Sequence, residues 1–250
     1  MRAGDAIRAI AEHGAYELSS KSDESPLTRA DTRADAIIAA ALQALDPGTP
    51  VISEEGLSSV EHGAPRRFWL VDPLDGTREF LAGNGEYTVN IALIEDGVPL
   101  LGVVHAPQHG TTYAACAGQG ATRSDAGGTR SIRAAADGPL VVVASRSHEH
   151  DALGAFLAEL PPHQAVAMGS SLKICLVAEG AAHLYPRLGT TCWWDTAAAH
   201  AIALEAGATI GTLDGLPLRY EGCDVRNPAF VCSSLARETW AAAADAVRGV

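Results

Sequence analysis

The chain has 250 residues, 47% of them hydrophobic and 19% charged, which excludes a disordered or fibrous protein and allows a sizeable core. Its 18 basic residues face 30 acidic ones, for a formal net charge of −12. That balance excludes a nucleic acid polymer as a partner, because binding its backbone requires clustered positive charge. It leaves room for a small phosphorylated substrate, since bound cations reverse the field locally.

Membrane and redox features also bear on the class of protein. No run of eighteen apolar residues is present and the first twenty residues lack a signal-peptide pattern, so no integral membrane segment is expected. The five cysteines are widely spaced without a CxxC pair, which disfavours a disulfide framework or a thiolate zinc site. A cytoplasmic location is therefore predicted, while the oligomeric state is not indicated.

The first half of the chain predicts two helices and then a series of strands. Apolar residues recur at helical spacing over 1–20 and 29–45, with a polar loop at 21–28 between them. Strands are expected at 50–55 and 67–72, a short helix at 75–81, and a hairpin over 87–107 whose turn is Asp96-Gly97. Residues 111–118 are expected to add a strand, and the glycine-rich residues 118–130 are expected to form a loop.

After about residue 137, strand and helix patterns mix. Strands are expected at 140–146, 163–169, 182–188 and 208–220, and helices at 151–160, 171–180 and 196–207. This mixture places the chain in the α/β or α+β class.

Acidic residues recur where the predicted strands end. Glu54 and Glu55 close one strand, Asp195 opens a helix, and Asp31 lies at the start of the second helix. Either of these two aspartates could be a plain helix N-cap. A single carboxylate in such a place therefore identifies no site by itself.

The segment DPLDGT, residues 72–77, concentrates oxygen ligands. The preceding strand would bring Asp72 to a sheet edge, and a turn at Pro73-Leu74 would direct the Leu74 carbonyl and Asp75 to the same point. Oxygen ligands without histidine or cysteine favour Mg²⁺, and free N–H groups at Gly76-Thr77 would suit a phosphate. The combination indicates phosphoryl chemistry, although an Asx-type turn would give the same pattern.

Three motifs together resemble a known family. VISEE, WLVDPLDGTREF and WWDTAAAHAIALEAGA resemble the three signatures of the lithium-sensitive, magnesium-dependent phosphatases, the family of inositol monophosphatase. The segments NGEYTVNIALIEDGVPLLGVVHAP, ASRSH and GSSLKICLVAEGAAHLYPRLGTTCWWDTAAAHA extend the resemblance, over nearly the whole chain, to its CysQ branch of 3′(2′),5′-bisphosphate nucleotidases. The chain departs from the pattern at Ala199, where the family usually has glycine, but no expected metal ligand is lost.

The resemblance implies a layered αβαβα sandwich with two subdomains. Residues 1–136 would carry most metal ligands, and residues 137–250 one metal ligand and the residues that select the nucleotide. Two or three Mg²⁺ ions would be held by Glu54, Asp72, the Leu74 carbonyl, Asp75 and Asp195. Thr77 would help to activate water, Asp31 would orient Thr77, and Glu54 would share in this catalytic set. The activated water would attack the phosphorus in line, without a covalent enzyme intermediate.

The resemblance also implies a substrate-binding set. It comprises Gly76, Thr77, His148, Ser170, Lys173, Tyr185, Arg187 and Asp195. Lys173 and Arg187 would meet the second phosphate of the nucleotide, and Tyr185 would line the base pocket. Alternatively, Lys173 lies on a solvated helix face, Arg187 forms a surface ion pair, and Tyr185 belongs to the core.

The implied activity is hydrolysis of the 3′-phosphate of adenosine 3′,5′-bisphosphate to AMP and phosphate, which recycles a by-product of sulfate assimilation. The corresponding phosphosulfate shares the 3′-phosphate and is a second expected substrate. An inositol or sugar monophosphatase is the alternative, and it would not need a cationic pocket for a second phosphate. A catalytically silent nucleotide-binding protein is a third possibility, disfavoured by the intact acidic residues.

Overall fold

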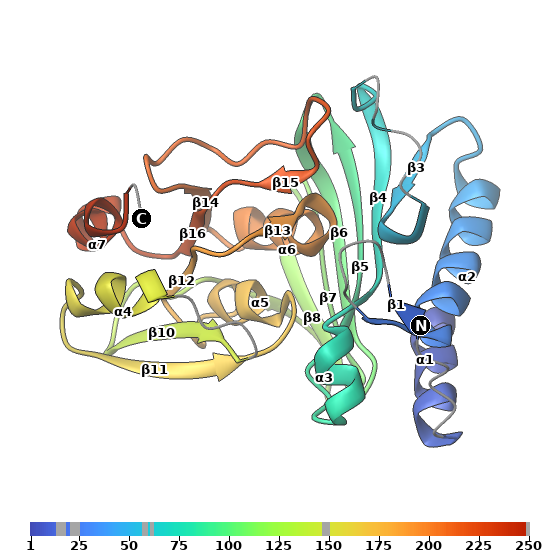
Figure 1. The fold of residues 1–250 in the computed structure, drawn as a ribbon, viewed down its shortest axis with the longest axis horizontal. Coiled ribbons are helices and arrows are strands. Elements are labelled where there is room, and N and C mark those ends of the chain that lie inside the picture. Colours follow the sequence, from blue (N-terminus) through green and yellow to red (C-terminus); the bar gives the residue numbers. More distant parts are fainter. Residues whose placement is uncertain (14–18, 21–25, 57–59, 61–62, 147–150, 249–250) are drawn as a thin grey trace.

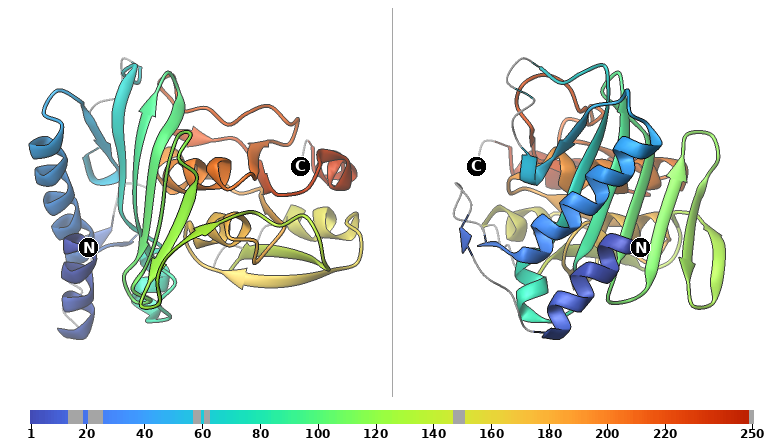
Figure 2. Two further views of the ribbon diagram at one scale, coloured as in Figure 1. Left: turned by 180° about the vertical axis from the view of Figure 1, so that it is seen from behind. Right: turned by 90° about the vertical axis from the view of Figure 1, so that its right-hand side faces the viewer.

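Helices and sheets alternate in five layers in this computed structural model, which describes residues 1–13, 19–20, 26–56, 60, 63–146 and 151–248 (Figure 1). Helices α1 (Arg2–His13) and α2 (Arg29–Leu45) cover one face of a seven-stranded sheet (Figure 2). Helices α5 (Leu172–Ala178) and α6 (Trp193–Glu205) separate this sheet from a five-stranded one. Helices α4 (Asp151–Ala158) and α7 (Ala241–Ala246) form the last layer, so the predicted αβαβα sandwich is confirmed.

Three hydrophobic clusters hold the layers together. Ile7 and Ile38 of α1 and α2 pack with Trp69 on the outer face of the first sheet. Phe68, from the opposite face of the same strand, packs with Trp193 of α6 in the largest cluster. The third cluster joins α4 and α7 to the second sheet. Each layer is therefore held to the next by buried apolar side chains, as sheet and helix faces require.

The first sheet has the strand order β3-β4-β5-β6-β7-β8-β9. Strands β3 and β4 run parallel and all later neighbours are antiparallel. The strands are β3 (Val51–Ser53), β4 (Arg67–Asp75), β5 (Thr88–Glu95), β6 (Val98–Ala106), β7 (Thr111–Cys116), β8 (Ala121–Asp125) and β9 (Gly128–Ile132). The 3-10 helix η1 (Glu54–Gly56) follows β3, and α3 (Thr77–Ala82) follows β4.

Strand β4 departs from the predicted turn at Pro73-Leu74. The strand continues to Asp75, and its pairing with β5 shifts register between Asp72, opposite Asn90, and Asp75, opposite Thr88. A regular strand would place residues three apart on opposite faces, because its side chains alternate. The extra residue in β4 acts as a bulge and returns Asp75 to the face of Asp72.

The second sheet has the order β11-β10-β12-β16-β14. Strand β10 is parallel to both of its neighbours, and β16 is antiparallel to β12 and β14. The strands are β10 (Leu140–Ser145), β11 (His163–Met168), β12 (Leu184–Arg187), β14 (Thr209–Thr212) and β16 (Phe230–Ser233). Smaller elements are the pairs β1 (Ser19–Ser20) with β2 (Pro26–Leu27) and β13 (Thr191–Cys192) with β15 (Arg226–Asn227), and the 3-10 helix η2 (Arg237–Thr239).

Several sequence predictions match the structure closely. The second helix occupies residues 29–45 as expected, and its Thr28 N-cap is reinforced by Asp31 in a capping box. The hairpin of β5 and β6 turns at Asp96 and Gly97, whose φ angles of 50° and 72° are both left-handed. This conformation suits a type I′ turn, which Asp-Gly favours.

The prediction of a loop over residues 118–130 is wrong. Strands β8 and β9 form a hairpin there, with Thr122 opposite Ser131. The glycines that suggested a loop occupy left-handed positions at the turns, such as Gly120 (φ 75°) and Gly128 (φ 106°). The short sequences between them pair as an edge hairpin because β7 offers a neighbouring strand.

Two further differences concern the chain ends and the short strands. Strands β15 and β16 and helix α7 were not predicted, because brief runs such as Phe230–Ser233 carry little periodicity. The polar loop predicted at 21–28 falls largely outside the described residues, and Pro26–Leu27 within it forms β2.

All five cysteines carry free thiols. Among the described helices, none has the length and apolar content needed to cross a membrane.

Candidate active site

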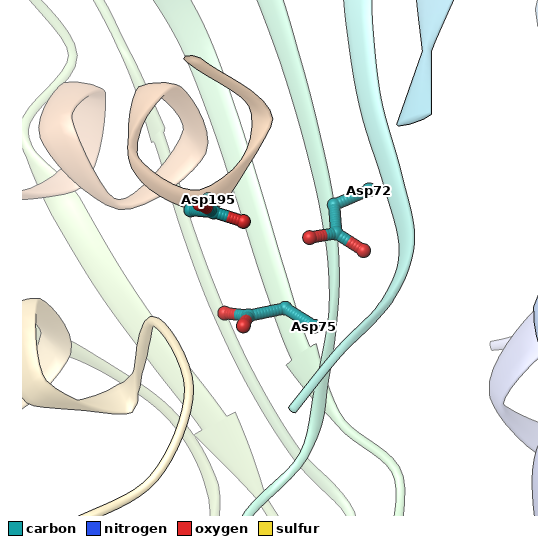
Figure 3. A group of neighbouring side chains, drawn as sticks. All are labelled: Asp72, Asp75 and Asp195. Carbon is teal, nitrogen blue, oxygen red and sulfur yellow. The ribbon is translucent and has the colours of Figure 1, made fainter. Parts of the chain in front are cut away.

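Three aspartates from distant parts of the chain meet at the inner face of the first sheet. Asp72 and Asp75 come from β4, and Asp195 comes from the first turn of α6. One carboxylate oxygen of each lies within 4.8 Å of the others, and the three side chains point toward one another (Figure 3). The bulge in β4 brings the first two together, and the packing of α6 on the sheet brings the third.

Asp195 also belongs to the start of its helix. It is the third residue of α6, and its Oδ2 accepts a hydrogen bond of 2.6 Å from the Cys192 N–H at the N-cap. The residue is therefore part of a capping box rather than the N-cap itself. This bond fixes the carboxylate in the position from which it faces Asp72 and Asp75.

Two of the three aspartates have a raised pKa. Burial, followed by the charges of Asp75 and Glu54, raises the pKa of Asp195 to about 7. Burial also raises the pKa of Asp75, against the opposing effects of the Lys173 ammonium and the Ser171 N–H. A cation placed between the carboxylates would remove this repulsion. Oxygen donors without histidine or cysteine fit a hard divalent ion.

Glu54 and Leu74 line the same cavity as the three aspartates. Glu54 starts η1 directly after β3 and raises the Asp195 pKa through its charge, but it lies outside the close group of three carboxylates. The Leu74 carbonyl accepts a hydrogen bond of 3.3 Å from the Thr77 hydroxyl.

Thr77 and Asp31, the pair that the family resemblance implied, lie within hydrogen-bond distance of each other. The Thr77 hydroxyl lies 3.4 Å from Asp31 Oδ1, while Asp31 Oδ2 accepts bonds from the Thr28 N–H (2.8 Å) and hydroxyl (2.6 Å). Asp31 is fully buried, so water does not compete for these bonds. Asp31 is therefore not the N-cap, which is Thr28: one of its oxygens completes the capping box, and the other faces Thr77.

Basic and aromatic side chains line the same cavity, which has a volume of about 360 Å³. Lys173 is buried rather than on a solvated face: its Nζ donates to the Ser170 carbonyl (2.6 Å) and lies 5.5 Å from the Tyr185 ring centroid. Burial lowers the Lys173 pKa to about 8, although Asp75 acts to raise it. Arg187 Nη2 donates to the Thr190 carbonyl (2.8 Å), and its buried Nε has no hydrogen-bond partner within the described chain.

Of the remaining predicted site residues, some line the cavity and one lies outside the described residues. Gly76, with φ 87°, and Ser170, with φ 47°, both line the cavity. Tyr185 lines it too and belongs to the main hydrophobic cluster, so both interpretations of this residue apply. His148 lies outside the described residues.

Comparison with known proteins identifies the family. The inositol monophosphatase family model matches residues 2–248. The chain belongs to the inositol monophosphatase family. Among its relatives, the 3′(2′),5′-bisphosphate nucleotidase CysQ of Salmonella typhimurium is 49% identical over 91% of this chain and 94% of that protein. A crystal structure of CysQ from Bacteroides thetaiotaomicron is 38% identical, covers 93% of both chains and superposes with a TM-score of 0.80. An IMPase of Thermotoga maritima, 24% identical with a TM-score of 0.80, shares the fold.

Membership of the inositol monophosphatase family confirms the resemblance found in the three motifs. The family is metal-dependent, and the cluster of Asp72, Asp75 and Asp195 is a site that could hold a metal ion.

Sequence reasoning missed several residues that lie in the cavity or contact Asp75. Glu79, on α3, is 4% exposed and lines the cavity. Ser171, Thr88 and Asn90 contact Asp75. The available signal was the alternation of β5, which places Thr88 and Asn90 on the face of Ala92, but only the fold shows what they meet.

Proposed function

We propose that this protein is a metal-dependent 3′(2′),5′-bisphosphate nucleotidase that converts adenosine 3′,5′-bisphosphate to AMP and phosphate. The observation that carries the proposal is the shared cavity. Its lining contains the carboxylates of Asp72, Asp75 and Asp195 together with the cations of Lys173 and Arg187. The carboxylates suit metal cations that hold the scissile phosphate, and Lys173 and Arg187 suit another phosphate. The CysQ name of the relatives supports the same substrate class.

Mg²⁺ fits the donor set, and we propose two or three ions held by Glu54, Asp72, the Leu74 carbonyl, Asp75 and Asp195. When bound, such ions neutralise phosphate oxygens, lower the pKa of water and stabilise the leaving oxygen. The donors come mainly from residues 1–136, and Lys173 and Arg187 come from residues 137–250. This distribution supports a division of the chain into two subdomains at that point.

The chain's own side chains orient the reactants. The Thr77 hydroxyl has one proton, which it can give to Asp31 Oδ1 or to the Leu74 carbonyl. Its oxygen then accepts a hydrogen bond from the attacking water and aligns it with the phosphorus. With a pKa of about 8, Lys173 is mainly protonated at neutral pH and provides a cation for the 5′-phosphate.

A second phosphate on the substrate distinguishes this function from that of an inositol or sugar monophosphatase. The phosphosulfate analogue also presents a charged 5′ group and is proposed as a second substrate. Recycling of the by-product of sulfate assimilation is the proposed role. A reducing, cytoplasmic location is proposed as well, supported by the five free thiols.

The decisive test is phosphate release with Mg²⁺, comparing kcat/KM for adenosine 3′,5′-bisphosphate and inositol 1-phosphate. A nucleotide preference of about a hundredfold, roughly 2.7 kcal/mol of transition-state binding, is expected. The Asp75→Asn variant, purified in parallel, should release almost no phosphate, which excludes a contaminating phosphatase. Equal rates or an inositol preference would overturn the substrate assignment. Full activity in Asp75→Asn would overturn the metal site.

A further inference from the structure

A buried polar network surrounds one oxygen of Asp75. Its Oδ2 accepts a 2.6 Å hydrogen bond from the Ser171 N–H and lies 3.3 Å from Asn90 Nδ2 and 3.4 Å from the Thr88 hydroxyl. Two N–H donors therefore converge on Oδ2, with the Thr88 hydroxyl beside them, and Oδ1 remains for a cation. Thr88, Asn90 and Ser171 are 0%, 1% and 4% exposed, so bulk water cannot replace a lost partner.

The hydroxyl groups of this network determine which group donates and which accepts in each hydrogen bond. The Ser171 hydroxyl donates its single proton to Asn90 Oδ1 at 2.8 Å, which leaves its oxygen to accept from Thr88 at 2.9 Å. Because Asn90 Oδ1 is occupied as an acceptor, the amide group turns its Nδ2 toward Asp75. The Ser171 side chain thus fixes the orientation of Asn90, and its backbone N–H binds Asp75 directly.

The network links the first sheet to the start of α5. Thr88 and Asn90 belong to β5 of the first sheet, whereas Ser171 is the N-cap of α5 and lies in the chain beside Ser170 and two positions before Lys173, both of which line the cavity. The segment before α5 is also tied to the segment before β5 by the Gly169 N–H, which donates to Glu86 Oε2 at 2.7 Å. A Cβ on Gly169 would lie 2.6 Å from Glu79 Cγ and 2.7 Å from the Glu86 carbonyl, so the contact is tight.

We propose that Ser171, Asn90 and Thr88 are positioning residues that fix Asp75 as a single-oxygen metal ligand. The proposal rests on the metal site of the proposed function, but not on its substrate. Hydrogen-bond partners of metal ligands typically change metal affinity by about 10- to 100-fold when they are removed, because the ligand then loses its orientation.

Mn²⁺ titration of the full-length protein, followed by the electron paramagnetic resonance of the free ion, tests the proposal without any substrate. We expect Ser171→Ala to raise the Mn²⁺ Kd by about tenfold. Thr88→Val preserves side-chain volume and removes the hydroxyl, and it should weaken binding in the same direction. Ser233→Ala is the matched control, since Ser233 is 1% exposed and its hydroxyl is bonded to Leu235, away from the cavity.

Weakened Mn²⁺ binding in Ser171→Ala and Thr88→Val, with an unchanged Kd in Ser233→Ala, would support the proposal. If Ser171→Ala does not fold, Thr88→Val decides. Wild-type affinity in the folded variants, or an equal loss in Ser233→Ala, would overturn it. Failure of the wild-type protein to hydrolyse the bisphosphate would overturn the proposed function instead, and the titration would still test the positioning residues.

Discussion

At the scale of single residues, substitution of the two basic side chains in the cavity tests which substrate the enzyme prefers. Lys173 and Arg187 both line the cavity that contains the aspartate cluster. A hydrogen bond to a charged group contributes about 1.5–3 kcal/mol. We therefore expect Lys173→Met and Arg187→Gln each to lower kcat/KM for adenosine 3′,5′-bisphosphate by at least about tenfold, chiefly through KM.

Arg226→Gln is a suitable control for this pair of variants. It removes one positive charge from the protein, but Arg226 is exposed and paired with Asp224 at 2.8 Å. Its kinetic constants should match those of the wild type. If Lys173→Met and Arg187→Gln also leave nucleotide turnover unchanged, these residues do not bind the second phosphate.

At the scale of elements, the closeness of β6 to α6 determines where Asp195 lies. Gly102 of β6 packs directly on the Ala198 carbonyl of α6, and an added Cβ would overlap that oxygen. Because a backbone carbonyl cannot rotate away, Gly102→Ala must displace the helix. We expect a loss of about 1–3 kcal/mol or more in the free energy of unfolding, measured with denaturant, and weaker Mn²⁺ binding because α6 carries Asp195.

The control for the Gly102→Ala variant is a substitution of Gly154 in α4. A Cβ on Gly154 meets no other atom within 4 Å, so Gly154→Ala should stabilise the protein by roughly 0.5–1 kcal/mol. A Gly102→Ala protein as stable as the wild type would show that α6 is not held at this distance from the sheet.

At the scale of the whole molecule, a buried histidine links stability to pH. His200 of α6 is 3% exposed, with Nδ1 3.0 Å from the Tyr220 hydroxyl. Burial lowers its pKa to about 3. Between about pH 6.5 and 3 the unfolded chain therefore binds a proton that the folded protein does not. His200 thus contributes stability that is present above pH 6.5 and is lost on acidification, at up to about 1.4 kcal/mol per pH unit.

The His200→Gln variant should reveal this contribution in denaturant unfolding at pH 7 and pH 5. The difference in unfolding free energy between the two pH values should shrink by about 2 kcal/mol relative to the wild type. His109→Gln, which changes an exposed histidine, should keep the wild-type difference. An equally large difference in His200→Gln would show that this histidine is not the source of the acid sensitivity.

The sequence by itself determined the fold class, the family and most elements of regular structure. Helical spacing over 29–45 and the Asp-Gly turn at 96–97 are local signals, because they depend on backbone preferences and on residues a few positions apart. The motifs also indicated that Asp72, Asp75 and Asp195 are oxygen ligands. They did so through the resemblance, since each aspartate alone could have been part of a turn or a helix cap.

Only the tertiary structure decided how those ligands meet and what holds them. The bulge that places Asp72 and Asp75 on one face of the sheet depends on the pairing of β4 with β5. The position of Asp195 depends on the contact between α6 and Gly102. The contacts of Ser171, Asn90 and Thr88 with Asp75 join residues 13 to 96 positions apart. Polar side chains of this kind carry no periodic signal along the chain, because their roles are set by whichever groups folding buries beside them.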